Sequence, residues 1–161
     1  MNRALALLFL AIVLRSHAIA EVPNKPRWED LSRLLGHLDS SRELADLRGS
    51  DKPQRVERGA NEYQLFFDER GYSLAFREGR LTKIFLQLVP GKKIRERAYV
   101  GTLPLDIRTI WVTPDEARRT FGPPTSDVSH GFREISYERA GHLITLYFSD
   151  QHIESIAIAI K

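Results

Sequence analysis

The chain repeats one pattern of residues about 70 positions apart, and this internal repeat constrains its fold more than any other feature. Three pairs of segments carry the repeat: 40–44 with 113–117, 67–71 with 137–141, and 81–88 with 153–160. Their offsets of 73, 70 and 72 residues differ little, and loops of unequal length absorb such differences. The repeat therefore predicts two copies of one structural unit.

The first twenty residues are typical of an export signal. Arg3 gives a basic start, an apolar run follows over 4–14, and 18–20 (AIA) has the small-x-small form that signal peptidases accept. The run is shorter than the roughly 20 apolar residues that span a bilayer. We predict a signal peptide over 1–20 and a periplasmic or secreted mature protein over 21–161, with an uncleaved anchor as the alternative.

Charge, cysteine content and length narrow the class of protein. The chain has a formal net charge of +3, and removing the two arginines of the signal segment leaves +1, too little for a large basic field that recruits nucleic acid. Because there is no cysteine, the chain forms no disulfide, no thiolate metal site and no bacterial lipoprotein anchor. The length suits one compact domain in which unit one (21–90) and unit two (91–161, including a connector) share a core.

Local patterns in unit one predict two helices followed by three strands. Apolar residues three and four apart favour an amphipathic helix over 28–38. Ser40 with Glu43 forms a capping box for a short helix that ends near residue 48. The polar segment 50–59 is typical of a loop. The strands expected after it are 62–68, 72–77 and 81–89, joined by glycine-containing turns.

Unit two has the same organisation after an extended connector over 99–107. Thr113 with Glu116 forms a capping box, and the glycine and prolines of 121–124 end that helix. A polar loop precedes three strands, 132–138, 142–148 and 153–160. The predicted fold class is therefore α+β, with two tandem helix-plus-three-stranded antiparallel meander repeats whose helices pack on one sheet face.

Alternation along the strands separates a buried sheet face from an open one. The side chains expected to face the helices are mostly large and apolar: Tyr63, Leu65, Phe67, Tyr72, Leu74, Phe76, Ile84, Leu86, Leu88, Arg133, Ile135, Tyr137, Ile144, Leu146, Phe148, Ile156, Ile158 and Ile160. Arg133 is first in its strand and is expected to reach solvent. The open face mixes polar and small side chains with rings: Gln64, Phe66, Ala75, Arg77, Lys83, Phe85, Gln87, Glu134, Ser136, Thr145, Tyr147, Ala157 and Ala159.

Seven residues of this open face form the candidate partner-binding site: Phe66, Phe85, Tyr147, Arg77, Lys83, Glu134 and Thr145. Large rings bury area at a low entropic cost, and small neighbours let a partner approach closely. Two alternatives stay open. Either another part of the chain covers the rings, such as a tail or the connector, or they form a homodimer interface.

The segment 99–107 (YVGTLPLDI), followed by 113–124 (TPDEARRTFGPP), resembles an uncharacterised group of bacterial exported proteins of immunity type. That group has a Y-x-G-x-L-P-x-G-L segment before a T/S-x-x-E helix that ends in L-G-x-P, and Asp106 stands where its glycine is usual. Over about 40–160 the tandem plan is similar to beta-lactamase inhibitor protein and, more distantly, to the SmpA/OmlA-type outer-membrane assembly lipoproteins. The inhibitor resemblance implies a concave sheet that grips a protein partner. The immunity-type group implies neutralisation of a toxin or enzyme in the envelope.

Catalytic motifs are missing from the sequence. There is no cysteine nucleophile and no G-x-S-x-G elbow. Ser149, Asp150 and His152 supply the letters of a triad, but they lie on one predicted turn, where they cannot converge. The histidines have no H-E-x-x-H or similar metal-ligand spacing, and Glu69 and Glu138 occupy equivalent turns. We predict no enzymatic activity, no metal and no cofactor.

A basic segment follows Pro90, with four cations in six positions: Lys92, Lys93, Arg95 and Arg97. It is not a P-loop, because the first glycine and the final serine or threonine are missing. A solvated loop is the simplest interpretation. The alternative is contact with anionic lipid, cell-wall polymer or an acidic partner.

The sequence as a whole predicts an exported, noncatalytic protein-binding protein of inhibitor or immunity type. Its open sheet face is expected to occlude a partner in the cell envelope, a toxin or an enzyme, and no binding of nucleic acid is expected. The alternative is an envelope-assembly or cell-wall-associated binding factor on a similar scaffold, with peripheral membrane contact.

Overall fold

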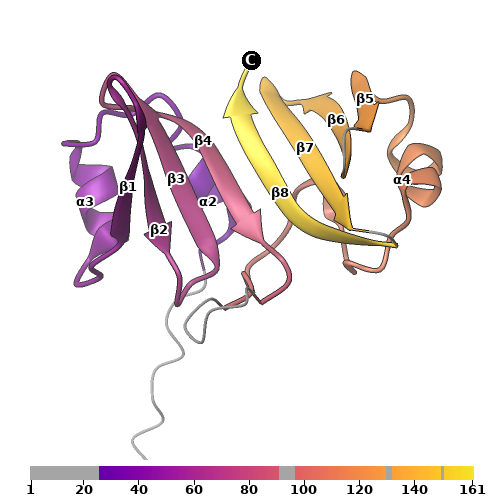
Figure 1. Cartoon of the computed structure of the whole chain (residues 1–161), viewed down its shortest axis with the longest axis horizontal. Coiled ribbons are helices and arrows are strands. Elements are labelled where there is room, and N and C mark those ends of the chain that lie inside the picture. Colours follow the sequence, from indigo (N-terminus) through magenta and orange to yellow (C-terminus); the bar gives the residue numbers. More distant parts are fainter. Residues whose placement is uncertain (1–25, 91–96, 130–131, 150) are drawn as a thin grey trace, which may run out of the picture.

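The computed structural model describes residues 26–90, 97–129, 132–149 and 151–161, so the predicted signal peptide lies outside the described residues. The described chain forms one continuous antiparallel sheet of eight strands with short helices beside it (Figure 1). Its strands are β1 (Gln54–Gly59), β2 (Glu62–Phe67), β3 (Tyr72–Arg77), β4 (Arg80–Gln87), β5 (Ser126–Ser129), β6 (Arg133–Arg139), β7 (His142–Ser149) and β8 (His152–Ile160). Its helices are α2 (Trp28–Ser32), α3 (Arg42–Arg48), the 3-10 turn η1 (Pro104–Asp106) and α4 (Pro114–Phe121). In the part of the chain described, no helix is long and apolar enough to cross a membrane.

The prediction of two helix-plus-three-stranded meanders is wrong. The strand order is β1-β2-β3-β4-β8-β7-β6-β5, so each half supplies four strands and both halves belong to one sheet. The additional strands, β1 and β5, lie where the sequence predicts loops, and nearly all of their residues are exposed. An edge strand is held by backbone hydrogen bonds to one neighbour and need not bury a side chain, so it leaves no alternating pattern in the sequence.

The helix predicted over 28–38 is also too long, because α2 ends at Ser32. Gly36 then adopts a positive φ of 86° and turns the chain toward β4. Its N–H donates to the carbonyl of Leu81 at 2.7 Å, and the Leu81 N–H donates to the carbonyl of His37 at 2.9 Å. Backbone pairing with β4 thus replaces the later turns of the helix, and the apolar side chains of 34–35 pack on the core from a turn.

The other two predicted helices are present as α3 and α4. Ser41 rather than Ser40 caps α3, and its side chain accepts a hydrogen bond from the Leu44 N–H at 3.4 Å. The capping box predicted for α4 is confirmed. The Glu116 N–H donates to Thr113 Oγ1 at 3.2 Å, and the Thr113 N–H donates to the Glu116 carboxylate at 2.8 Å.

The core lies between the sheet and the helices. The apolar side chains predicted to face inward are at most 7% exposed, which confirms the predicted alternation, except that Ile160 is 49% exposed. Arg133 is partly exposed, as expected for the start of a strand. Leu31 of α2, Leu44 of α3 and Ala117 of α4 are fully buried in the same core. Figure 1 shows α2 and α3 beside the first half of the sheet and α4 beside the second.

The connector after Arg97 fills the space between these helices. Tyr99 is 6% exposed and Ile107 8%, and both belong to the core cluster. The Tyr99 hydroxyl donates to the carbonyl of Pro26, and burial raises the pKa of that hydroxyl well above its usual value. Because the connector packs on the helix-covered face, the alternative in which it covers the rings of the open face is wrong.

The internal repeat corresponds to a two-fold relation centred on the β4–β8 pair. Phe85 and Ala157 are equivalent at the offset of 72 residues, and they lie directly opposite each other in register. The same offset makes Lys83 equivalent to Ser155 and Gln87 to Ala159. The register pair Lys83–Ala159 is therefore exchanged with the register pair Gln87–Ser155. Each position of the open face can therefore be compared with its counterpart in the other half.

Gly71 and Gly79 provide a matched test of how closely the connector packs on the β2–β3 turn. Both have a φ of +72°, which costs a non-glycine residue about 1–2 kcal/mol. A Cβ on Gly71 would overlap the backbone of Ala98 and Tyr99, whereas one on Gly79 would meet no described atom within 4 Å. We expect Gly79→Ala to lower the free energy of unfolding by about 1 kcal/mol and Gly71→Ala by about 3 kcal/mol or more, measured by urea denaturation. Equal losses would contradict the close approach.

Candidate protein-binding face

Every strand contributes one residue to a row of side chains across the open face. In register the row is Gln54, Phe66, Ser73, Phe85, Ala157, Thr145, Ser136 and Ser126. The two-fold relation exchanges Phe66 with Ser136 and Phe85 with Ala157. The half from β1 to β4 therefore carries two rings at positions where the half from β5 to β8 carries small side chains.

The small side chains of this row form a closed floor. Ser136 and Thr145 are each 8% exposed, Ser73 is 6% exposed and Ala157 is 3% exposed. The hydroxyls of Ser136 and Thr145 are hydrogen-bonded to each other at 2.9 Å. Gln64 Nε2 donates to Ser73 Oγ at 2.7 Å. Because these polar atoms have partners within the sheet, the floor is rigid. Thr145, which was predicted for the binding site, is a buried part of this floor.

The three rings predicted for the site belong to Phe66, Phe85 and Tyr147. They lie above this floor, and each of them is partly exposed. The Lys83 ammonium lies 5.5 Å from the centre of the Phe85 ring, and the Arg58 guanidinium lies 5.7 Å from the centre of the Phe66 ring. Cation-π contacts at such distances contribute about 0.5–1 kcal/mol at exposed sites. Each of the two phenylalanines on the open face of the first half is therefore accompanied by a cation.

A pocket of about 160 Å³ opens between Phe66 and Phe85. Ser73 lies between the two rings in register and lines the pocket, and the charged residues Asp68 and Arg97 line it as well. The Arg97 N–H donates to the carbonyl of Asp68 at 2.8 Å, which fixes the connector at this wall. Sequence reasoning missed Asp68 and Ser73, because their role depends on the approach of the connector to the β2–β3 turn.

Arg97 is the described member of the basic segment considered as an anionic-surface candidate. Its side chain is exposed and lines the pocket. Lys92, Lys93 and Arg95 lie outside the described residues. The structure thus relates this segment to the candidate face through Arg97.

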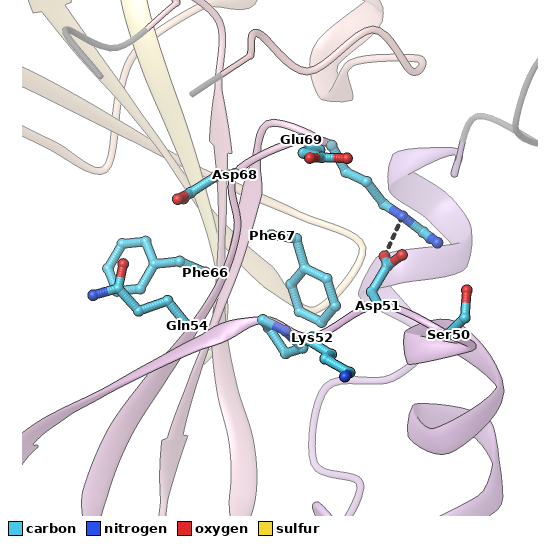
Figure 2. Close-up of a pocket in the computed structure, with 10 residues that line it drawn as sticks. Ser50, Asp51, Lys52, Gln54, Phe66, Phe67, Asp68 and Glu69 are labelled. Atoms are coloured by element: carbon cyan, nitrogen blue, oxygen red, sulfur yellow. Dashed lines mark ion pairs between the residues drawn. The ribbon is translucent and has the colours of Figure 1, made fainter. Parts of the chain in front are cut away.

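A larger hollow of about 490 Å³ lies beside Phe66, lined by residues 50–54 and 66–70 (Figure 2). Figure 2 shows Phe66 and Phe67 pointing to opposite sides of β2. Asp51 and Arg70 form an ion pair at 2.6 Å in its wall. Phe66, Phe67 and Asp68 line both this hollow and the smaller pocket, so the two recesses adjoin each other at the end of β2.

The charged residues of the predicted site are divided between the two halves of the face. Lys83 accompanies Phe85, whereas Arg77 forms an ion pair with Glu62 at 2.7 Å and does not line the pocket. Glu134 of β6 lies opposite Tyr147 of β7 in register. The structure therefore brings together a ring pair with cations in one half, and a ring with a carboxylate in the other.

Metal-binding and triad chemistry find no support in the described ranges. Among the residues described, no group of three or more histidines and carboxylates is placed to hold a metal ion. Ser149 and His152 lie opposite each other in register across the β7–β8 hairpin, and Asp150 lies outside the described residues.

Comparisons with known proteins give a likeness of fold. No protein-family model and no curated protein matches the chain. Among solved structures, an extracellular protein containing an SCP domain from Bacillus anthracis str. Ames is similar, with a TM-score of 0.53 and 11% identity, over 86% of this chain and 47% of that one. This chain therefore spans about half the length of that protein. A DUF4309 family protein (YjgB) from Bacillus subtilis gives a TM-score of 0.46 and 13% identity, over 73% of this chain and 77% of that one.

The proximity of Glu134 to Tyr147 predicts a pH effect that can be measured on this face. Burial, and to a smaller extent the charge of Glu134, raise the pKa of Tyr147. We expect Glu134→Gln to lower the pKa of Tyr147, observed by NMR titration of the labelled tyrosine ring. Glu138→Gln is the matched control, since Glu138 forms its ion pair with Lys161.

The sign of the accompanying stability change follows from linkage. A tyrosine whose pKa is raised in the folded state contributes full stability below its ordinary pKa near 10 and loses it as the pH rises toward the folded value. The Glu134→Gln protein should therefore lose less stability than the unaltered protein between neutral and alkaline pH. An unchanged Tyr147 titration would show that Glu134 does not act on the ring.

Proposed function

We propose that this protein is exported and noncatalytic, and that it binds a protein partner on its open sheet face, as an inhibitor or immunity protein does. One observation carries this proposal. Phe66, Phe85 and Tyr147 stay partly exposed on one face, while the described helices and the connector pack on the other. Rings held on a rigid floor lose little entropy when a partner covers them.

Two further observations support the proposal. The first twenty residues have the pattern of a secretory signal, which would make the protein periplasmic or secreted. The resemblance of the segments 99–107 and 113–124 to exported proteins of immunity type suggests neutralisation of a toxin or enzyme. The partner would then be an enzyme or toxin in the same compartment, whose working surface becomes inaccessible in the complex.

Substitution of the rings tests this function. Phe66→Ser, Phe85→Ser and Tyr147→Ser each remove a partly exposed ring, so we expect a loss of about 1 kcal/mol in stability and an unchanged circular dichroism spectrum. Partners are purified on the tagged protein from an envelope fraction, and their dissociation constants are then measured by calorimetry. We expect at least one of the three substitutions to weaken binding about 30-fold or more, as removal of a central interface ring does.

Trp111→Ser provides the matched control. Trp111 is 71% exposed and packs against His152 at the β7–β8 hairpin, with ring centres 5.3 Å apart, and it lies outside the ring row. Its loss should leave binding unchanged. The proposal fails if the partner binds the three serine variants normally. It also fails if the protein is a dimer that the same substitutions dissociate, or if outer-membrane assembly components are recovered in place of a single occluded enzyme or toxin.

A further inference from the structure

We infer that the pocket between Phe66 and Phe85 receives one aromatic side chain of the partner, flanked in the partner's sequence by carboxylates. This inference rests on the proposed function and names the group that the face recognises. It follows from three properties of the pocket, which are its size, its rigidity and the charges around it.

The size of the pocket fits a single ring. A cavity of about 150 Å³ in another protein core binds benzene, whereas pockets for drug-sized ligands measure about 300–1,000 Å³. The volume here is about 160 Å³, and Phe66 and Phe85 supply apolar walls. A ring entering between them can stack or meet them edge-on, which adds about 0.5–1.5 kcal/mol to the burial of its area.

The wall of the pocket is fixed before any partner arrives. The Gln87 N–H donates to the carbonyl of Gly71 at 2.8 Å, and the Tyr99 N–H donates to the carbonyl of Gln87 at 2.6 Å. Gly71 allows this layering, because a side chain at that position would overlap the connector backbone. A preformed wall reduces the ordering cost of binding, so a single inserted side chain can act as an anchor.

Cations predominate around the pocket. Arg97 and Asp68 both line it, while Lys83 and Arg58 lie beside the two rings. Among the described residues, neither Lys83 nor Arg58 forms an ion pair with a carboxylate. Three cations against one carboxylate favour acidic groups next to the inserted ring and disfavour basic ones.

Among the residues described, the two-fold relation places no equivalent of this pocket in the second half of the sheet. Its counterpart positions there are Ser136, Thr145 and Ala157, which are nearly buried and carry no ring. The two-fold relation therefore does not generate a second copy of this pocket. In the second half the Tyr147 ring lies beside the Glu134 carboxylate, where the rings of the first half have cations, so the two halves would hold the partner in one orientation.

Short peptides test the recognised chemistry without the natural partner. The probes are acetylated and amidated pentapeptides: Gly-Glu-Phe-Glu-Gly, Gly-Lys-Phe-Lys-Gly and Gly-Glu-Ala-Glu-Gly. Each is titrated into the isotope-labelled protein, and binding is followed through backbone amide resonances. We expect the acidic phenylalanine peptide to shift the resonances of Ser73 and Phe85 with saturation. It should bind about fivefold or more tightly than the lysine peptide, and the alanine peptide should give no saturable shift.

Matched variants separate the ring pocket from the charges. Lys83→Gln should remove most of the preference for the acidic peptide, because Lys83 lies beside the Phe85 ring. Arg77→Gln should leave the preference unchanged, because Arg77 lies on the same face but its charge is paired with Glu62. Ser73→Leu fills the pocket between the two rings and should abolish binding with both rings retained. This variant keeps the test valid if Phe66→Ser or Phe85→Ser fails to fold.

The outcomes distinguish this inference from the function on which it rests. Absence of binding by every peptide, equal binding of the lysine peptide, or shifts that map to another surface would each overturn the pocket chemistry. In those cases the proposed function would still be supported if the ring substitutions weaken binding of the purified partner. Conversely, saturable peptide binding at the pocket, combined with a partner that binds all three serine variants normally, would overturn the proposed function and leave the pocket chemistry intact.

Discussion

Antiparallel pairing of β4 with β8 is the interaction on which the rest of the structure depends. It joins the two halves through register pairs that run from Lys83 with Ala159 to Gln87 with Ser155. On the covered face the same pairing places Ile84 opposite Ile158 and Leu86 opposite Ile156, all fully buried. Separate halves would each leave this apolar strand as an open edge, which exposes both backbone groups and core side chains. One sheet therefore forms in place of two repeats, and its open face extends across both halves.

The position of the connector decides which face stays open. Its apolar side chains, Tyr99 and Ile107 among them, complete a core that three short helices cannot cover alone. A chain of this length has few other segments with which to cover the second face. The rings of that face consequently remain partly exposed, and the approach of Tyr99 to Gly71 builds the wall of the pocket at the same time. Packing of the core and formation of the candidate site thus depend on one segment.

Hydrophobic alternation allowed the covered face and the ring positions to be predicted, because buried strands must alternate. The same criterion could not detect β1 or β5, since β1 (QRVERG) and β5 (SDVS) bury almost nothing and are held by the backbone of one neighbour. The helix over 28–38 was overestimated for the opposite reason. Its apolar side chains do reach the core, but backbone bonds from Gly36 and His37 to Leu81 end the helix early. The pocket could not be predicted from the sequence. Gly71 indicates a turn, but it does not indicate that the backbone of Ala98 and Tyr99 packs against that turn.

Duplication explains how this sheet can carry a specific surface without loss of stability. At equivalent core positions the two halves are alike, since Ile84 corresponds to Ile156 and Leu86 to Ile158, and all four are fully buried. Side chains on the open face alternate with these, so they can differ between the halves without disturbing the core. The rings that form the pocket, Phe66 and Phe85, occupy such open-face positions. Their equivalents in the other half are Ser136 and Ala157, which carry no ring. A repeat that kept the open face symmetric would offer two equivalent sites and no preferred orientation, whereas this asymmetry would let a two-fold scaffold hold the proposed partner in one orientation.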